Sequence, residues 1–490
     1  MKKIILILCS LSLATSLCAQ NEFEEYKRKR NQQFSKYAET QKDAFEKYKE
    51  AANTEYANRM KERWEAFQIR QGIAAPKSPD PVIPPVFDPK EEAPVKKLPK
   101  EVVINEIPKV VKEPKVSVPK AALPKISTEV PKSRKIFDYY GSVCTIQYNE
   151  EMLFKLSSAN EAEVANVWNH LSSGASNLWL NECMTMREKY NLCDWAYLKF
   201  TQKAAESIFG DGTNEAILLQ AYTMIQTGYK LRLGRAGGML CLFVPSDYIM
   251  YNYSYVPIDG LKYFALKSDM ADGGGVYIFD ANFPEEHLLS LEVSQPNIDV
   301  KLSGNGVFTS KRYPDVTVEL TSNLNLIDFY NEFPRNSSWD VFSKASLSPT
   351  VKNKLYPKLK EMIKGKSQEE SANILINFVQ TAFQYKTDGE QFGYERPLFG
   401  DEIFYYPYSD CEDRSILYSI LVRELMGLDV VFLHYKGHLA TAVNFDEDIN
   451  GDYLTFEGRK YLVCDPTYIN AHIGLTMPQY VGEPVSIVKI

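Results

Sequence analysis

Three residues in the last quarter of the chain have the types and the order that thiol-based acyl transfer needs. His438 follows Cys411 by 27 residues, and Asp465 follows His438 by a further 27. A cysteine can attack a carbonyl carbon, and a histidine can take its proton. A carboxylate can then hold the histidine tautomer and stabilise its charged form. These residue types therefore predict a Cys-His-Asp triad.

The surrounding sequence predicts the elements that would position this triad. Ser409 and Glu412 have the spacing of a capping box, which starts a helix, and Gly427 supplies the stop after an apolar stripe. Cys411 would then lie in the first helical turn. There, unpaired N–H groups and the positive end of the helix dipole favour a thiolate and can bind an oxyanion. The histidine and the aspartate are expected on strands beside this helix.

These motifs resemble the core of the transglutaminase-like superfamily over roughly residues 371–478. The pieces that carry the resemblance are Asp410-Cys411-Glu412-Asp413 before a helix, Gly437-His438 entering a strand, and Cys464-Asp465-Pro466-Thr467-Tyr468 closing one. It implies an α+β, papain-like catalytic domain at 366–490, with Cys411 as nucleophile, His438 as base and Asp465 as the orienting residue.

The resemblance also implies a protein or peptide substrate and a second oxyanion donor upstream of the nucleophile. Gln384 and Tyr385 are the candidates for that donor. One departure is Leu439-Ala440, because bacterial relatives often follow the histidine with a small residue and tryptophan. No cofactor is implied. The chain has no CxxC pair and no HExxH, which argues against a zinc site.

Other interpretations of these residues remain open. A lone cysteine before a helix is often only a small buried hydrophobe. His434 is a rival base, and His472 is expected to be structural. Cys464 is a buried thiol or half of an active-site disulfide.

The sequence does not choose the acyl acceptor. Water would make a peptidase or amidase and a lysine amine a protein cross-linker; hydrolysis is favoured because water is always present. The alternative function is a non-catalytic interaction protein, presented on the N-terminal segments. Carbohydrate hydrolysis has no distinguishing motif.

Part of the pattern recurs upstream. Residues 211–244 align without gaps on residues 410–443, with seven identities. Gly212, Met239 and Lys267 stand where the triad would be, and none of them can perform the required role. We therefore predict a degenerate transglutaminase-like copy at 136–280, with an unrelated α/β region as the alternative. Strand-like alternation predicts a β-rich connecting region at 281–365.

The N-terminal segments differ from the rest in composition. Residues 1–19 have the charge, apolar run and cleavage site of a signal peptide, which predicts export to the periplasm, the cell surface or the medium. Leu17 disfavours a lipid anchor at Cys18. Residues 20–72 repeat an aromatic residue every eleven positions, which predicts a long helix with one straight stripe. That helix either packs on the body of the protein or self-associates. Residues 73–135 hold 13 of the 26 prolines and are expected to act as a spacer.

Composition limits the function classes. The 490 residues are 44% apolar, which is sufficient for a sizeable core. The net charge of −7 argues against a nucleic-acid partner. After the first twenty residues no apolar run could cross a bilayer. The six cysteines beyond the signal could form disulfides, but Cys411 must stay free to react.

Overall fold

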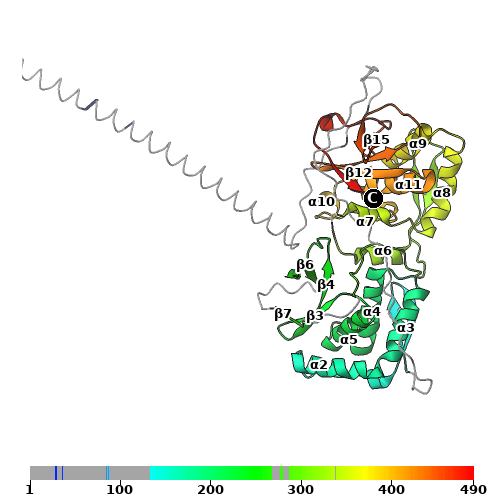
Figure 1. Cartoon of the computed structure of the whole chain (residues 1–490). Helices are drawn as coiled ribbons and strands as arrows, with labels where there is room; N and C mark the ends of the chain where they lie inside the picture. Colours follow the sequence, from blue (N-terminus) through cyan, green and yellow to red (C-terminus); the bar gives the residue numbers. More distant parts are fainter. Residues whose placement is uncertain are drawn as a thin grey trace, which may run out of the picture. The chain divides into compact units, whose positions relative to one another are not determined.

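The computed structural model describes residues 133–266, 276–279, 286–336 and 338–490, with the isolated positions 28, 29, 36, 84, 86 and 87. The predicted signal peptide lies outside the described residues, as does nearly all of the 20–72 helix and the 73–135 linker. All elements from residue 133 onward belong to one compact unit, Gln71–Ile490. This unit is mixed α+β, as predicted, and contains two curled antiparallel sheets (Figure 1).

The first half begins with an antiparallel hairpin and continues with helices and a five-stranded sheet. The hairpin is β1 (Ser133–Tyr139) and β2 (Ser142–Tyr148), and a 3-10 turn η1 (Glu150–Met152) follows. The helices are α2 (Glu161–His170), the π-helical turn η2 (Leu171–Ala175), α3 (Asn177–Lys189), α4 (Asp194–Phe209) and α5 (Asn214–Gln226). The strands of the sheet are β3 (Arg232–Ala236), β4 (Met239–Ser246), β5 (Tyr255–Ile258), β6 (Leu261–Ala265) and β7 (Val276–Phe279).

Helix α5 is the buried centre of this half. Thr213 caps its N-terminus by accepting a hydrogen bond from Ala216 N at 3.2 Å. The chain leaves the helix through Gly228, whose φ of +98° suits glycine. The interior of α5 is almost fully buried and packs against α4 on one side and β4 on the other. Burial on both sides explains why an isolated amphipathic stripe is not evident in its sequence.

The region 281–365, predicted to be β-rich, contains more helix than strand among its described residues. Its strands are the short pair β8 (Gly306–Thr309) and β9 (Thr317–Leu320), and its helices are α6 (Leu324–Asn331), α7 (Trp339–Lys344) and α8 (Pro349–Ile363). Asn323 and Ser348 cap α6 and α8. The alternating residues before Gly306 form the isolated bridges His287–Tyr229 and Leu302–Asn323 but no ladder, so the described part of this segment has no sheet.

The second half carries the predicted triad. It contains α9 (Gln368–Thr381), β10 (Gln384–Tyr385), α10 (Asp388–Gln391), the 3-10 turn η3 (Glu402–Phe404), β11 (Tyr408–Ser409), α11 (Cys411–Met426), β12 (Asp429–Tyr435), β13 (His438–Asn444), β14 (Tyr453–Phe456), β15 (Arg459–Cys464), the 3-10 turn η4 (Pro478–Tyr480) and β16 (Ser486–Lys489). Helix α11 is buried from Glu412 to Val422 and packs against α9 and the β12–β13 hairpin.

The two halves have the same sheet topology. The strand order is β14-β15-β13-β12-β16 in the second half and β5-β6-β4-β3-β7 in the first, which correspond strand for strand in chain order. In each, a buried helix precedes a hairpin with a two-residue turn, so Tyr435 pairs with His438 and Ala236 with Met239. The upstream region therefore has the helix and strands expected of an internal repeat. Lys267 lies outside the described residues.

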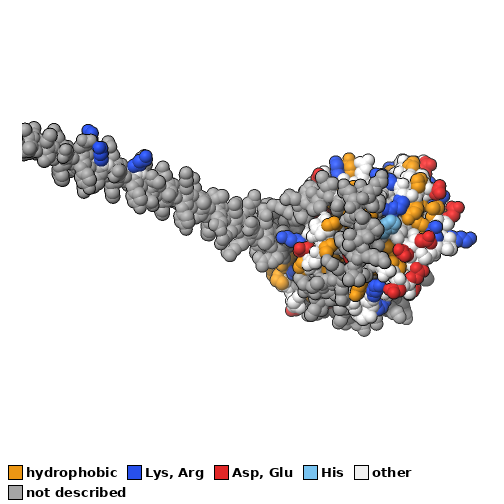
Figure 2. Space-filling view, turned by 90° about the horizontal axis from the view of Figure 1, so that it is seen from above, with side chains coloured by type: hydrophobic (Ala, Val, Ile, Leu, Met, Phe, Trp, Pro, Cys, Tyr) orange, Lys and Arg blue, Asp and Glu red, His pale blue; other side chains and the backbone are white. Residues whose placement is uncertain are grey.

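Two surface properties bear on partners. No helix within the described ranges combines the length and the apolar character needed to cross a membrane. On the face that Figure 2 shows, basic and acidic side chains lie among each other and among hydrophobic ones.

Candidate active site

Cys411 is the first residue of α11, as the sequence predicts, but the capping pair differs from the predicted one. Asp410 is the N-cap and Asp413 completes the capping box; the carboxylate of Asp413 accepts from Asp410 N at 3.2 Å. Ser409 instead belongs to β11 and accepts from the Arg414 guanidinium at 3.2 Å. The predicted Ser409–Glu412 box was wrong by one residue, because pairing of β11 with β10 keeps Ser409 extended.

His438 and Asp465 come together through the sheet. His438 opens β13, and Asp465 directly follows β15, the neighbouring antiparallel strand. The His438 Nε2 to Asp465 Oδ2 distance is 2.8 Å, and both side chains are buried. The other carboxylate oxygen of Asp465 accepts from Thr467 N at 2.9 Å. The aspartate is thus fixed on one side by backbone and holds the imidazole on the other.

The Cys411 thiol also acts on the His438 ring and contributes to the shift of its pKa. Burial alone would lower the pKa of His438. The charge and hydrogen bond of Asp465, together with the Cys411 thiol, outweigh burial and raise that pKa to about 10. Because Asp465 binds Nε2, Nδ1 is the ring nitrogen left for the sulfur. The structure therefore brings Cys411, His438 and Asp465 into one connected group.

The rival histidines lie elsewhere. His434, on β12, packs its ring 4.8 Å from the ring of Trp339. His472 lies 3.1 Å from the Asn373 side-chain oxygen through Nδ1, and Arg312 is next to the same nitrogen. Of the histidines weighed from the sequence, His438 is the one bonded to Asp465.

The candidate oxyanion residues lie on β10, which runs parallel to the segment leading into Cys411. Gln384 pairs with Tyr408 and Tyr385 with Ser409. Gln384 is exposed, whereas Tyr385 is half-buried. Burial, and then the charge of Cys411, raise the pKa of Tyr385 well above its usual range. Tyr385 therefore keeps its hydroxyl proton at neutral pH, which makes it the better candidate donor of the two.

Two tyrosines that sequence reasoning missed form a wall over the histidine. The ring of Tyr480 stacks on His438 with centroids 4.9 Å apart and planes at 8°, and Tyr435 stacks on Tyr480 at 4.9 Å. Tyr435 is signalled by its place before the Lys436-Gly437 turn, opposite His438. No local pattern marks Tyr480, which comes from the 3-10 turn η4.

Sequence reasoning also missed a buried group of carboxyls beside Cys411, which includes Asp410 and Asp413. Carboxyl oxygens of Asp388, Asp410 and Asp413 lie within 4.8 Å of one another. Burial and the charges of Asp410 and Asp413 raise the pKa of Asp388 to about 11, so it is protonated at neutral pH. Glu412 accepts from the Cys411 thiol at 3.0 Å, and burial raises its pKa well above the usual range.

These carboxyls are engaged within the protein. Asp388 accepts from Arg396 N at 2.5 Å, and Asp413 accepts from Leu398 N at 2.8 Å. They anchor the 388–398 segment to the start of α11. The signal that could have identified them is the number of acidic residues flanking Cys411 in an otherwise apolar helix.

None of the other described cysteines forms a disulfide: Cys144, Cys183, Cys193, Cys241 and Cys464. Cys464 precedes Asp465 but is fully buried, and burial raises its pKa well above the usual range. The structure thus favours the buried-thiol interpretation of Cys464 over an active-site disulfide.

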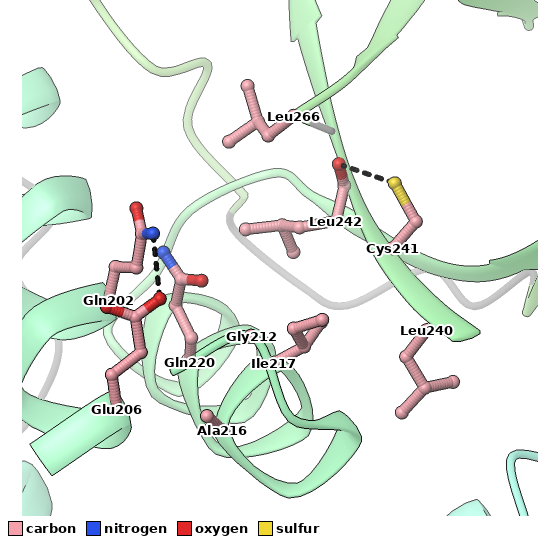
Figure 3. A pocket seen from close by; sticks show the side chains of 10 residues that line it. All are labelled: Gln202, Glu206, Gly212, Ala216, Ile217, Gln220, Leu240, Cys241, Leu242 and Leu266. Carbon is pink, nitrogen blue, oxygen red and sulfur yellow. Dashed lines mark hydrogen bonds between the residues drawn. The ribbon is translucent and has the colours of Figure 1, made fainter. Parts of the chain in front are cut away.

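In the first half, a cavity of about 160 Å³ lies at the start of α5 and along β4 (Figure 3). Gly212, which stands where Cys411 would be, lines it, and a side chain at that position would meet nothing within 4 Å. The Asn214 side chain bonds Gly238 O and Leu240 N, at 3.0 and 2.8 Å. These bonds bracket Met239 and hold the hairpin turn at the start of α5. Gly212 and Met239 thus lie near one another, and neither residue can act as a nucleophile or as a base.

Comparison of this chain with protein-family models, with curated proteins and with solved structures gives no match in any of the three.

Proposed function

We propose that the protein is an exported thiol hydrolase that cleaves amide or peptide bonds, with a transglutaminase-like, papain-like catalytic domain at 366–490. The observation that carries the proposal is the 2.8 Å bond between His438 Nε2 and Asp465, in a ring whose pKa the Cys411 thiol also raises. Cys411 starts a helix, His438 opens one strand and Asp465 directly follows a neighbouring strand. Nucleophile, base and orienting carboxylate in this order form the arrangement that activates a thiol.

In the proposed reaction the Cys411 thiolate attacks the carbonyl carbon of the substrate, and the carbonyl oxygen becomes an oxyanion. The N–H of Cys411 and the Tyr385 hydroxyl are the proposed donors to that oxyanion. The C–N bond then breaks, the protonated His438 gives its proton to the leaving amine, and a thioester remains on Cys411. Water attacks the thioester with His438 taking a proton, which releases the carboxylic acid and restores the enzyme.

The environment of His438 suits the acid half of this cycle. The raised pKa, about 10, keeps the imidazole charged at neutral pH, where it can stabilise a thiolate and protonate an amine. Tyr480 covers one face of the ring and limits its rotation. Asp465 remains paired to the ring throughout, so the charge that forms on His438 always has a partner.

Activity-based labelling tests the proposal. A peptide vinyl sulfone, a Michael acceptor that forms a thioether with an activated thiol, should modify Cys411, identified by mass spectrometry of the digested protein. The matched control is Cys193, a half-buried thiol whose pKa burial raises to about 11. We expect labelling at Cys411 to be abolished by His438→Ala and unchanged by Cys193→Ser. Equal modification of both thiols, or labelling that persists in His438→Ala, would favour the non-catalytic alternative.

The acceptor is tested with the same protein. A peptide ester or amide substrate is incubated with and without excess lysine methyl ester, and the products are identified and quantified by mass spectrometry. We propose hydrolysis, so the free acid should dominate in both reactions. An amide to lysine as the main product would make the protein a transamidase.

We further propose that the first half is a degenerate copy of the catalytic domain. The matching strand order, the aligned hairpin turn and the placement of Gly212 and Met239 support this origin. Such a copy would buttress the catalytic half without performing chemistry. Restoring a cysteine alone, as in Gly212→Cys, should therefore give no labelling by the peptide vinyl sulfone.

A further inference from the structure

A short part of the proline-rich segment contacts the catalytic half. Val86 forms a parallel β-bridge with Ile469, and Phe87 N donates to Ile469 O at 2.9 Å. The Phe87 ring meets Tyr468 edge-on, with centroids 6.0 Å apart and planes at 89°. Val86 remains 65% exposed. One side chain points to solvent and the next to protein, which is the alternation of an extended strand.

The surface that receives Phe87 adjoins the proposed triad. Phe87 packs on the cluster of Tyr468, Ala471 and Met477, and Tyr480 packs on the same cluster. The ring of Tyr480 also stacks on the ring of His438. Tyr468 lies three residues after Asp465 and donates its N–H to Asp465 O at 3.3 Å. Phe87 therefore packs on the same cluster as the tyrosine that stacks on the proposed base.

The receiving loop is rigidly held. Gln380 Nε2, which is buried on α9, donates to three carbonyl oxygens of this loop: Asp465 O at 3.1 Å, Tyr468 O at 2.7 Å and Ala471 O at 3.1 Å. A fixed loop that offers both a backbone bond and an apolar surface matches how proteins bind extended peptides. Main-chain hydrogen bonds give affinity in that mode, and pockets for alternate side chains give specificity.

We propose that the surface formed by Tyr468, Ile469, Leu475, Met477 and Tyr480 is the polypeptide-binding subsite of the catalytic half. It would take an extended substrate segment with an aromatic side chain in the place of Phe87. Val86 and Phe87 occupy the subsite as a substrate segment would. This inference rests on the proposed function, whose substrate class it makes more specific.

The in-chain segment and a substrate would compete for the subsite. A segment on the same chain as its binding surface competes at an effective concentration that a free peptide must overcome. The contact consists of one aromatic side chain and backbone bonds to one residue, and neither Val86 nor Phe87 has a charged side chain that could form an ion pair. Replacing Phe87 with a smaller residue should therefore weaken this contact and free the subsite for a peptide, without unfolding the domain.

The test uses the full chain carrying Cys411→Ala, so that no turnover is needed. The probe is a fluorescent peptide with the sequence of residues 82–89, Val-Ile-Pro-Pro-Val-Phe-Asp-Pro. Fluorescence anisotropy should give binding at least about ten-fold tighter when Phe87→Ala is added, because the tethered competitor is weakened. Val86→Ala is the matched control, since its side chain is exposed, and should behave as the parent.

Two further variants make the result specific. In the Phe87→Ala background, Tyr468→Ala should abolish peptide binding, and a probe with alanine in place of phenylalanine should not bind. Circular dichroism checks that Tyr468→Ala is folded, and Met477→Ala serves as a second, milder change on the same surface. No binding to the Phe87→Ala protein, or equal binding with Tyr468 and Met477 both altered, would overturn the subsite. Because Cys411 is absent from this assay, its failure is separate from failure of thiol labelling.

Discussion

His438 turns Nε2 toward Asp465 at 2.8 Å, and both Asp465 and the Cys411 thiol raise the pKa of the same ring. This relationship joins the start of α11 to the end of β15 through the first residue of β13. It is the link on which the proposed chemistry depends most directly, and it can be tested without altering the sulfur.

Asp465→Asn should lower kcat for a peptide substrate by about 10²- to 10⁴-fold, the usual share of general acid–base catalysis. The amide keeps an oxygen for Thr467 N, so the loop should stay in place, but it cannot stabilise a charged imidazole. Steady-state kinetics with a matched thermal melt provide the measurement. A rate within a few-fold of the parent would show that Asp465 does not support His438.

The pH dependence should show a basic limb near pH 10. Burial lowers the pKa of His438, but Asp465 and Cys411 raise it overall, to about 10, from an ordinary 6.5. A raised pKa means that the charged ring stabilises the fold fully below pH 6.5, and that this contribution is lost as pH rises through 10. As the pH approaches 10, His438 also loses the proton that it donates to the leaving amine. In Asp465→Asn this basic limb should move to lower pH, which kcat measured across pH 6–11 would show. If the limb stays at the same pH, it reports the titration of a group other than His438.

Asp388→Asn should make stability less sensitive to pH. Burial, then Asp410 and Asp413, raise the pKa of Asp388 from 3.8 to about 11. Between these values the unfolded chain releases a proton that the folded chain keeps, so the folded state loses stability as pH rises. Asparagine removes this penalty and can still accept from Arg396 N. The melting temperature of the variant relative to the parent should therefore rise from pH 5 to pH 9. Exposed Asp448→Asn is the control and should show no such trend.

Gly427→Ala should destabilise the protein by about 1 kcal/mol, because Gly427 ends α11 at φ +70°, where a side chain is strained. Gly389→Ala is the matched control. Gly389 lies within α10 without a positive φ, and a side chain there would meet nothing within 4 Å. Denaturant unfolding of both variants should separate them. Equal stability would mean that the end of α11 relaxes at no cost.

The sequence by itself determined the short-range features. The bounds of α11 follow from its capping residues, its apolar run and Gly427, all of which act within one helix. The hairpin of β12 and β13 follows from two alternating runs around Lys436-Gly437. The upstream copy could be found because the same local units recur at a fixed offset.

Only the tertiary structure decided which side chains meet around the sulfur. Both Ser409–Glu412 and Asp410–Asp413 could have capped α11, and the pairing of β11 with β10 chose the second. Tyr480 reaches His438 from a turn 42 residues later in the chain, and no spacing rule predicts a contact of that kind. The pKa values of the buried carboxyls were likewise decided by the tertiary structure. A sequence shows that acids are present, but their pKa values depend on burial and on neighbouring charges, which exist only once the segments are packed together.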